Sequence, residues 1–146
     1  MFHVTFKVNG EPRGKGRARF ARMGNFVRTY TDEKTRTYED QIKQVAQKAM
    51  GLSEPLKTAL DVFLYISTPV PASYPKKRKE ACLNGFMLPT KRPDIDNVAK
   101  AVLDAIAGVV YVNDTQIVNL YATKKYGEPF IEVLVRETEI GENHDS

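Results

Sequence analysis

The feature that most constrains the fold of this chain is the stretch from Leu88 to Glu137. In its first part, apolar residues recur at helical spacing and define one buried helix face, followed by a glycine suited to a left-handed stop. A helix over 96–107 is therefore predicted, preceded by an extended segment because Pro93 disfavours helical backbone at the residue before it. The apolar positions are Val98, Ala101, Val102, Ala105 and Ile106, and the glycine is Gly108.

The rest of the chain adds strands and one more large helix around this element. Gln116–Tyr126 and Phe130–Glu137 are strand-like runs joined by Gly127, Glu128 and Pro129, which predicts an antiparallel pair. Strands are also predicted over 2–8 and 59–68, the latter central in the sheet, with a helix over 32–50 and a short basic helix ending at Gly85. We expect an α/β fold, a single domain with a mixed β-sheet packed against two main helices.

Length and segment composition give the expected boundaries. The 146 residues suffice for one compact domain, taken as 1–136, followed by an acidic and flexible tail over 137–146. The chain contains no apolar run of about 20 residues, and its N-terminus lacks the order of a secretion signal. The expectation is a soluble cytoplasmic protein with no membrane partner.

Few side chains are available for soft-metal or histidine chemistry. The lone Cys82 is most simply a small buried apolar residue, and His3 and His144 lie at opposite ends of the chain. Carboxylates and lysines remain as the titratable groups, so a bound metal should be a hard cation with oxygen ligands.

The basic excess indicates a polyanionic partner. Residues 1–136 hold 22 basic and 14 acidic residues, a net charge of +8, and the segment 13–28 holds six basic residues and no acid. Phe20, Phe26 and Tyr30 interleave aromatic rings with these cations, which favours nucleic-acid binding over an ordinary solvated charge run. The segment is expected to be a mobile loop or hairpin. The candidate DNA-binding residues are Arg13, Lys15, Arg17, Arg19, Arg22, Lys91 and Arg92.

A group of carboxylates surrounds the helix over 96–107. Asp94 and Asp96 are two apart, so an extended backbone at the helix entrance would direct both to the same side. Asp114 follows in the turn after the helix, and an antiparallel return of the chain could bring it back toward the first two. Partial positive charge at the helix N-terminus favours phosphate there.

These residue types suit phosphodiester hydrolysis. Mg²⁺, with Mn²⁺ as a substitute, held by Asp94, Asp96 and Asp114 would activate water and neutralise the charge of the transition state. Lys100 would contact the scissile phosphate.

Simpler roles compete at each position. Asp94 or Asp96 could serve only as the N-cap of the helix, and Asp114 only as a turn residue. Asp104 suits an ion pair with Lys100 four residues earlier better than metal ligation, although its role stays open. Tyr121, Tyr126 and Phe130 are expected to pack on the sheet or at a subunit interface.

The order of these elements resembles the RusA family of Holliday junction resolvases. The resemblance rests on RPDIDNVAK followed by AVLDAIAGVVYVNDTQI, covering roughly 91–136, with looser similarity in GKGRARF and YTDEKTRTYE. It implies a homodimeric, Mg²⁺-dependent endonuclease that makes paired nicks in branched DNA, the four-way junction. The family's essential aspartates would be Asp94, Asp96 and Asp114, and its lysine would be Lys100.

Three functions are compatible with this sequence. The favoured one is a structure-selective endodeoxyribonuclease of DNA recombination and repair, with a non-catalytic nucleic-acid-binding module second and a metal-dependent phosphatase last. Paired cuts in opposing strands also require two copies of a chain that has carboxylates for one site. The dimer interface is not fixed by the sequence; its candidate residues are Val118, Leu120 and Ile131.

Overall fold

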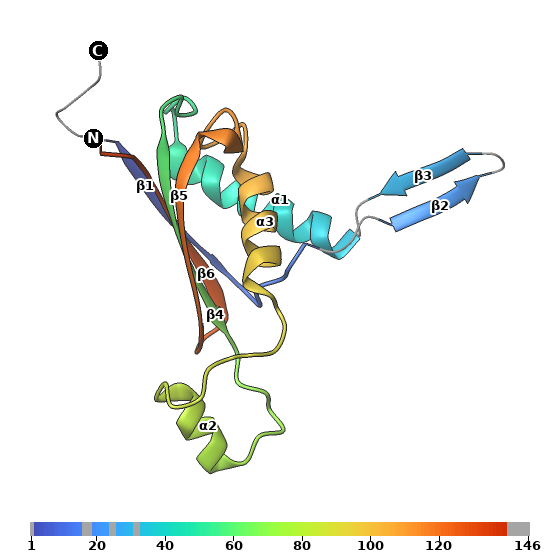
Figure 1. The fold of residues 1–146 in the computed structure, drawn as a ribbon, viewed down its shortest axis with the longest axis vertical. Helices are drawn as coiled ribbons and strands as arrows, with labels where there is room; N and C mark the ends of the chain where they lie inside the picture. The colour runs from blue at the N-terminus through green and yellow to red at the C-terminus, as the bar shows by residue number, and fades with distance from the viewer. Residues whose placement is uncertain (1, 16–18, 24–25, 31–32, 140–146) are drawn as a thin grey trace.

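A mixed four-stranded sheet carries the fold (Figure 1). The computed structural model describes residues 2–15, 19–23, 26–30 and 33–139, and in the second and third of these ranges only the backbone. The elements in chain order are β1 His3–Asn9, β2 Arg19–Met23, β3 Phe26–Tyr30, α1 Glu33–Met50, β4 Leu60–Thr68, α2 Lys76–Leu83, α3 Ile95–Ile106, the 3₁₀ turn η1 Asp114–Gln116, β5 Ile117–Tyr126 and β6 Phe130–Glu137.

The predicted elements are present. The helices expected over 32–50 and 96–107 are α1 and α3, and the short basic helix is α2, with Gly85 just beyond it at a φ of 82°. β4 lies between β6 and β5 and is therefore central, as predicted. The backbone of the basic segment forms the antiparallel β2–β3 hairpin, which extends away from the sheet (Figure 1). The sequence also predicts Thr31 as the N-cap of α1, and this residue lies outside the described ones.

The predicted pairing of the last two strands is wrong. The sheet order is β1-β6-β4-β5, so β4 separates β5 from β6, with β5 parallel and β6 antiparallel to it. Two strand spacings amount to about 10 Å, which the three residues 127–129 can span. Gly127 lies at the crossing: its N–H donates to the Thr68 carbonyl at 3.0 Å, and a Cβ there would lie 2.8 Å from the rotatable Ser67 Oγ.

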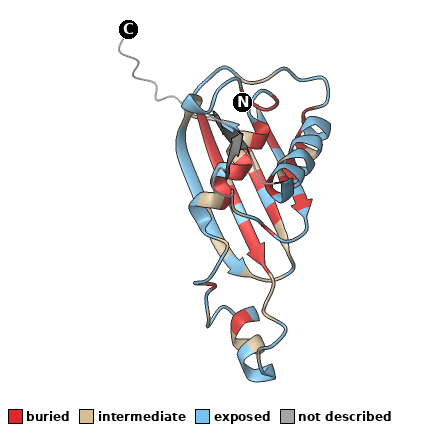
Figure 2. Cartoon of the chain, turned by 90° about the vertical axis from the view of Figure 1, so that its right-hand side faces the viewer, coloured by how far each residue is buried: buried red, intermediate tan, exposed pale blue. Residues whose placement is uncertain are grey.

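One face of this sheet carries the hydrophobic core. α1 and α3 pack side by side on that face (Figure 1). Alternate residues of β1 point into the core, and the apolar face of α3 is buried together with the turn at Tyr111. Many of the buried residues lie along the strands of the sheet, whereas most residues of α2 and its flanking segments are exposed (Figure 2). α2 buries mainly Cys82, which is 2% exposed, as the sequence predicted.

None of the described helices covers the other face of the sheet (Figure 1). Phe63 stacks on Tyr121 with ring centroids 4.9 Å apart. The buried carboxylate of Asp61 accepts hydrogen bonds from Asn119 at 2.7 Å, Thr138 at 2.8 Å and Arg136 at 3.1 Å. The Asn119 hydrogen bond is the largest of the contacts that lower the pKa of Asp61, and they outweigh the opposing effect of burial. This network joins β4 to β5, β6 and the segment after β6.

Within the described part of the chain, no helix has the length and apolar character needed to cross a membrane.

Candidate functional site

The first turn of α3 presents two exposed carboxylates. Asp94 occupies the N-cap position with extended backbone, while Asp96 already lies within the helix. The expectation of an extended backbone through both residues is therefore wrong, because the helix begins at Ile95.

Asp94 does not behave as an ordinary cap. Its carboxylate accepts no hydrogen bond from the backbone of the first turn, and its Oδ2 instead accepts from Nδ2 of Asn97 at 3.2 Å. An exposed carboxylate at the positive end of a helix, oriented by an amide rather than used as a cap, remains available to a cation or a proton.

Asp114 lies at the opposite end of α3. The chain leaves α3 at Ile106, turns at Gly108 and reaches Asp114 at the start of η1, while Asp94 precedes the first residue of the helix. The 12 residues of α3 give it a length of about 18 Å. Among the described residues, no three acidic, histidine or cysteine side chains are grouped so that they could hold a metal ion. The antiparallel return considered for Asp114 therefore does not bring it to Asp94 and Asp96 within one chain.

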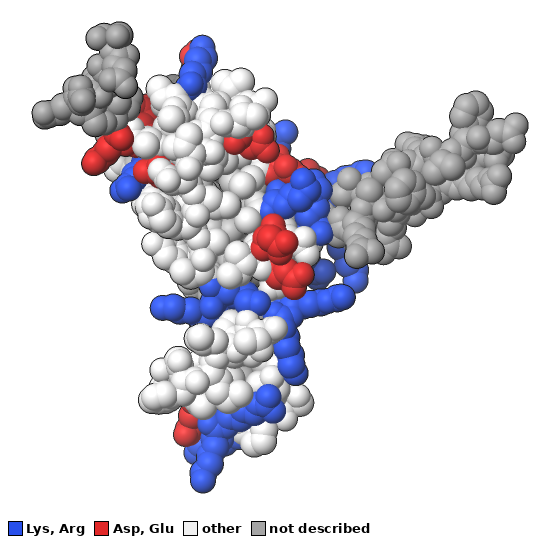
Figure 3. Space-filling view, in the orientation of Figure 1, with Lys and Arg blue, Asp and Glu red and all other residues white. Residues whose placement is uncertain are grey.

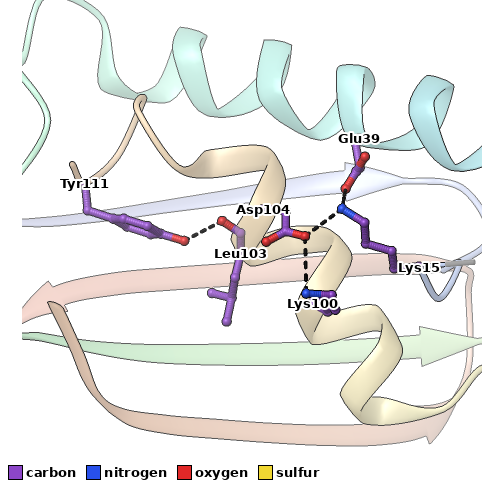
Figure 4. A network of polar contacts seen from close by, with 6 residues as sticks. All are labelled: Lys15, Glu39, Lys100, Leu103, Asp104 and Tyr111. Atoms are coloured by element: carbon purple, nitrogen blue, oxygen red, sulfur yellow. Dashed lines mark hydrogen bonds and ion pairs between the residues drawn. The ribbon is translucent and has the colours of Figure 1, made fainter. Parts of the chain in front are cut away.

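Side-chain hydrogen bonds fix the turn that carries Asp114. Asn113 and Gln116 form a capping box, and Nε2 of Gln116 donates to the carbonyls of Leu56 and Thr58, each at 2.9 Å. The buried Tyr111 donates its hydroxyl to the Leu103 carbonyl (Figure 4). Burial, followed by the charges of Asp114 and Asp104, raises the pKa of the Tyr111 hydroxyl. Asp114 itself stays exposed on this frame.

A cleft lies beside the Asp94 end of α3. Its volume is about 610 Å³ and it brings the segment before the hairpin next to the segment before the helix. Its lining residues are Glu11, Pro12, Arg13, Gly14, Lys15, Arg92, Pro93, Asp94 and Asn97. The exposed Arg13 and Arg92 side chains give this cleft a cationic rim next to the Asp94 carboxylate.

Close packing fixes the wall of the cleft. The Lys15 N–H donates to the carbonyl of Asn97 at 2.9 Å. A Cβ on Gly14 would lie 2.7 Å from the Cβ of Asn97, so glycine is required for this approach. The chain entering the hairpin is thereby held against the first turn of α3.

The Lys15 side chain makes contacts that sequence reasoning missed. Its Nζ lies 2.6 Å from Asp104 of α3 and 3.0 Å from Glu39 of α1 (Figure 4). Burial lowers the pKa of the ammonium, but the hydrogen bonds and charges of the two carboxylates raise it overall. Lys15 thus bridges both helices at the base of the hairpin. Residues 15, 39 and 104 have no regular spacing, so no local pattern could have revealed this contact.

Asp104 has two cationic neighbours. Besides Lys15, the predicted partner Lys100 lies at 3.8 Å and is 64% exposed. Asp104 is therefore engaged in ion pairs, and Lys100 extends mostly into solvent on the helix face that also carries Asp96, four residues earlier.

The remaining candidate DNA-binding residues divide into two groups. Arg13, Lys91 and Arg92 are exposed around the Asp94 end of α3. Arg17 lies outside the described residues, and Arg19 and Arg22 lie on β2, whose side chains are not described.

The α/β fold, the exposed carboxylate pair and the cationic cleft define a candidate metal-dependent phosphodiesterase site. A family model described as endodeoxyribonuclease RusA matches residues 9–136. The chain is also 33% identical over 138 residues to an uncharacterized protein of Bacillus subtilis (strain 168), YqaN, covering 92% of this chain and 96% of that protein. The chain therefore belongs to the RusA endodeoxyribonuclease family.

Proposed function

We propose that this protein is a Mg²⁺-dependent endodeoxyribonuclease that resolves four-way DNA junctions by paired cleavage of opposing strands. One observation supports this most strongly: the exposed carboxylates of Asp94 and Asp96 lie beside a cleft rimmed by Arg13 and Arg92, and the Asp94 side chain makes no capping hydrogen bond. Membership of the RusA family supports DNA as the substrate.

Each residue of the site has a proposed task. The oxygens of Asp94 and Asp96 fit two ligands of a hard cation, and Asn97 orients the first of them. When bound, Mg²⁺ lowers the pKa of a water and neutralises phosphate charge. The exposed Lys100 ammonium and the first backbone amides of α3 hold the scissile phosphate. Arg13 and Arg92 position the neighbouring phosphates at the cleft.

A second copy of the chain would complete the ligand set. Asp114 is separated from Asp94 and Asp96 by the length of α3, so three carboxylates do not meet in one chain. In a two-fold dimer the Asp114 of each copy can approach the carboxylate pair of the other, which yields two equivalent sites. Two sites are the number that paired cleavage requires.

The edge strand β5 offers a way to build this dimer. Lys124, near the end of β5, donates to the Pro93 carbonyl at 2.9 Å, so Asp94 adjoins that end, whereas Asp114 lies three residues before the other end. Antiparallel pairing of two β5 edges would place the beginning of one strand beside the end of its mate. Val118 and Leu120, which are 58% and 45% exposed, lie on this strand. The third predicted interface residue, Ile131, is fully buried and cannot contact a second copy directly.

A mixing experiment tests the catalytic assignment and the shared site together. Asp96→Asn and Asp114→Asn chains should each fold, bind a labelled four-way junction and fail to nick it with Mg²⁺. After unfolding and refolding in an equal mixture, hybrids would contain one intact site, formed by Asp96 of one chain and Asp114 of the other. Nicking should return at about one quarter of the wild-type number of sites, because half the dimers are hybrids and each has one of two sites.

The control is the same mixture with both substitutions in one chain and none in the other. In that hybrid each shared site lacks one aspartate, so the mixture should keep only the sites of its wild-type dimers, about one quarter of the wild-type number. Sites contained within single chains would instead leave about one half. About half of the wild-type nicking in this control, with none in the first mixture, would exclude the shared site. Junction binding without any divalent requirement, and no nicking by the wild type, would favour a non-catalytic binding module.

The β5 interface has a separate test. Leu120→Asp should give a monomer of 16.5 kDa in sedimentation and lose nicking while keeping its fold. Leu52→Asp is the control, because Leu52 is likewise an exposed leucine but follows α1, away from β5. A Leu120→Asp protein that stays dimeric would place the interface elsewhere.

A further inference from the structure

Apart from Lys91 and Arg92, residues 69–92 between β4 and α3 have no part in the proposed cleavage site. Residues 69–92, termed here the basic lobe, contain α2 and project from the end of the sheet below α3 (Figure 1). Its basic residues are Lys76, Lys77, Arg78, Lys79, Lys91 and Arg92, and its one acid is Glu80.

Charge is concentrated in this lobe. Six basic residues against one acid give it a net charge of +5, whereas the whole chain carries +4, so the remainder of the chain is slightly acidic at −1. On the face drawn in Figure 3, lysines and arginines gather at the far end of the lobe and again at its junction with the body. Among the described residues, no acid lies within ion-pair distance of these cations. The lobe therefore presents charge that a polyanion can neutralise.

Two of these cations lie near the same aromatic ring, that of Tyr74. The Arg78 guanidinium lies 3.9 Å from the centroid of the Tyr74 ring, and the Lys91 ammonium lies 6.0 Å from the same centroid. One ring thus links a cation of α2 to a cation that precedes Asp94 by three residues. Tyr74 therefore lies between a cation of the helix and a cation of the segment that leads to the carboxylate pair.

The lobe is attached to the end of β5. Lys124 donates to the carbonyls of Lys91 at 2.8 Å and Pro93 at 2.9 Å, which fixes the chain where it leaves the lobe. Cys82 is buried, and residues 82–85, 87 and 88 border a cavity of about 310 Å³ that Lys125 and Tyr126 also line. Burial, and then a hydrogen bond to Tyr74, raise the pKa of Tyr126. These contacts fix the backbone of the lobe against the end of β5.

We propose that the basic lobe binds the phosphates of a DNA arm next to the cleavage point, as a second nucleic-acid contact beside the β2–β3 hairpin. This inference rests on the proposed DNA substrate. The α3 N-terminus lies between the hairpin and the lobe (Figure 1), so a branched molecule with its branch near Asp94 would place one arm along each. A polymer of regularly spaced negative charges fits this surface better than a single small anion, because the cations extend along a helix and into the segment at its base.

Salt dependence of binding tests the proposal. The lobe variant carries Lys76→Ala, Lys77→Ala and Lys79→Ala, and retains Arg78 because of its contact with Tyr74. The matched control carries Lys43→Ala, Lys48→Ala and Lys57→Ala, three exposed lysines on α1 and in the turn before β4. Binding of a four-way junction is measured with chelator present, so that the result is independent of cleavage.

Each lost phosphate contact should reduce the slope of log affinity against log salt by about 0.9. We expect the lobe variant to lose two to three such contacts, with an affinity loss of about tenfold or more at 0.15 M salt, and the control variant to keep the wild-type slope. Equal salt slopes of junction binding for the two variants would overturn the proposal. Wild-type protein that binds anionic vesicles through these lysines, but binds no DNA, would also overturn it. Absence of nicking with a retained slope difference would refute the proposed function and leave the lobe's role in binding intact.

Discussion

The bridge between Lys15, Glu39 and Asp104 allows a quantitative test of how the hairpin base is held. Replacement of Lys15 by Met keeps the length of the side chain and removes its charge. The two carboxylates that it joins, 17% and 31% exposed, then face each other without the cation. Both interatomic distances, 3.0 and 2.6 Å, are those of charge-assisted hydrogen bonds.

The size of the effect follows from this geometry. A hydrogen bond to a charged group contributes about 1.5–3 kcal/mol when shielded from water, and partial exposure reduces that value. We therefore expect Lys15→Met to lower the free energy of unfolding by about 2 kcal/mol. The coupling between Lys15→Met and Asp104→Asn should be about 1–2 kcal/mol in a double-mutant cycle.

The pair formed by Lys100 and Asp104 serves as the internal control. Its atoms are 3.8 Å apart and Lys100 is 64% exposed, so its coupling should be below about 0.5 kcal/mol. Denaturant unfolding monitored by circular dichroism measures both cycles. A coupling for Lys15 no larger than that for Lys100 would refute the bridge.

The raised pKa of Lys15 predicts the pH range over which the bridge stabilises the fold. Its contribution is fully present below the unfolded pKa, near 10.5, and is lost as pH rises through the higher folded value. The stability difference between wild type and Lys15→Met should therefore stay constant from pH 7 to about pH 10.

Three further predictions concern the cleft, the sheet and the metal. Gly14→Ala should impair junction nicking, because its Cβ would meet the Cβ of Asn97 at 2.7 Å. The control Gly127→Ala should retain activity, because its Cβ would meet only the rotatable Ser67 hydroxyl. Equal activities of the two variants would contradict the requirement for glycine at position 14. Asp61→Asn should lower the free energy of unfolding at pH 7 by about 2 kcal/mol. Because the folded pKa of Asp61 lies below the usual 3.8, this difference from wild type should shrink as pH falls through that lower value. A difference that stays unchanged in acid would exclude ionised Asp61 as its cause. Chelation should abolish nicking, with recovery on addition of Mg²⁺ or Mn²⁺ but not Zn²⁺, and full activity after exhaustive chelation would refute the metal mechanism.

Local pattern was sufficient to predict the helices and strands. The apolar spacing of α3 and its glycine stop, the alternation of β1, and the apolar run of β4 all express backbone periods that are readable in sequence. That Asp94 and Asp96 lie together at the start of α3 also required only short-range information, although the extended backbone predicted through both residues was wrong because the helix begins at Ile95.

Strand adjacency depended on tertiary structure. The short connection of residues 127–129 predicted a hairpin, yet it crosses the end of β4, which lies between β5 and β6. Strand propensity and turn residues describe what each segment is and in which direction the chain turns. They do not reveal that a strand formed about 60 residues earlier occupies the intervening position.

The sequence by itself determined which residue types the site could use, since oxygen ligands and cations were the available groups and their motif order indicated the family. Tertiary structure decided where those groups lie. It placed Asp114 at the far end of α3, and it brought Lys15 between Glu39 and Asp104, residues 24 and 89 positions away. Side-chain chemistry is a property of single residues, whereas such distances arise only when α1, α3 and the sheet pack around a common core.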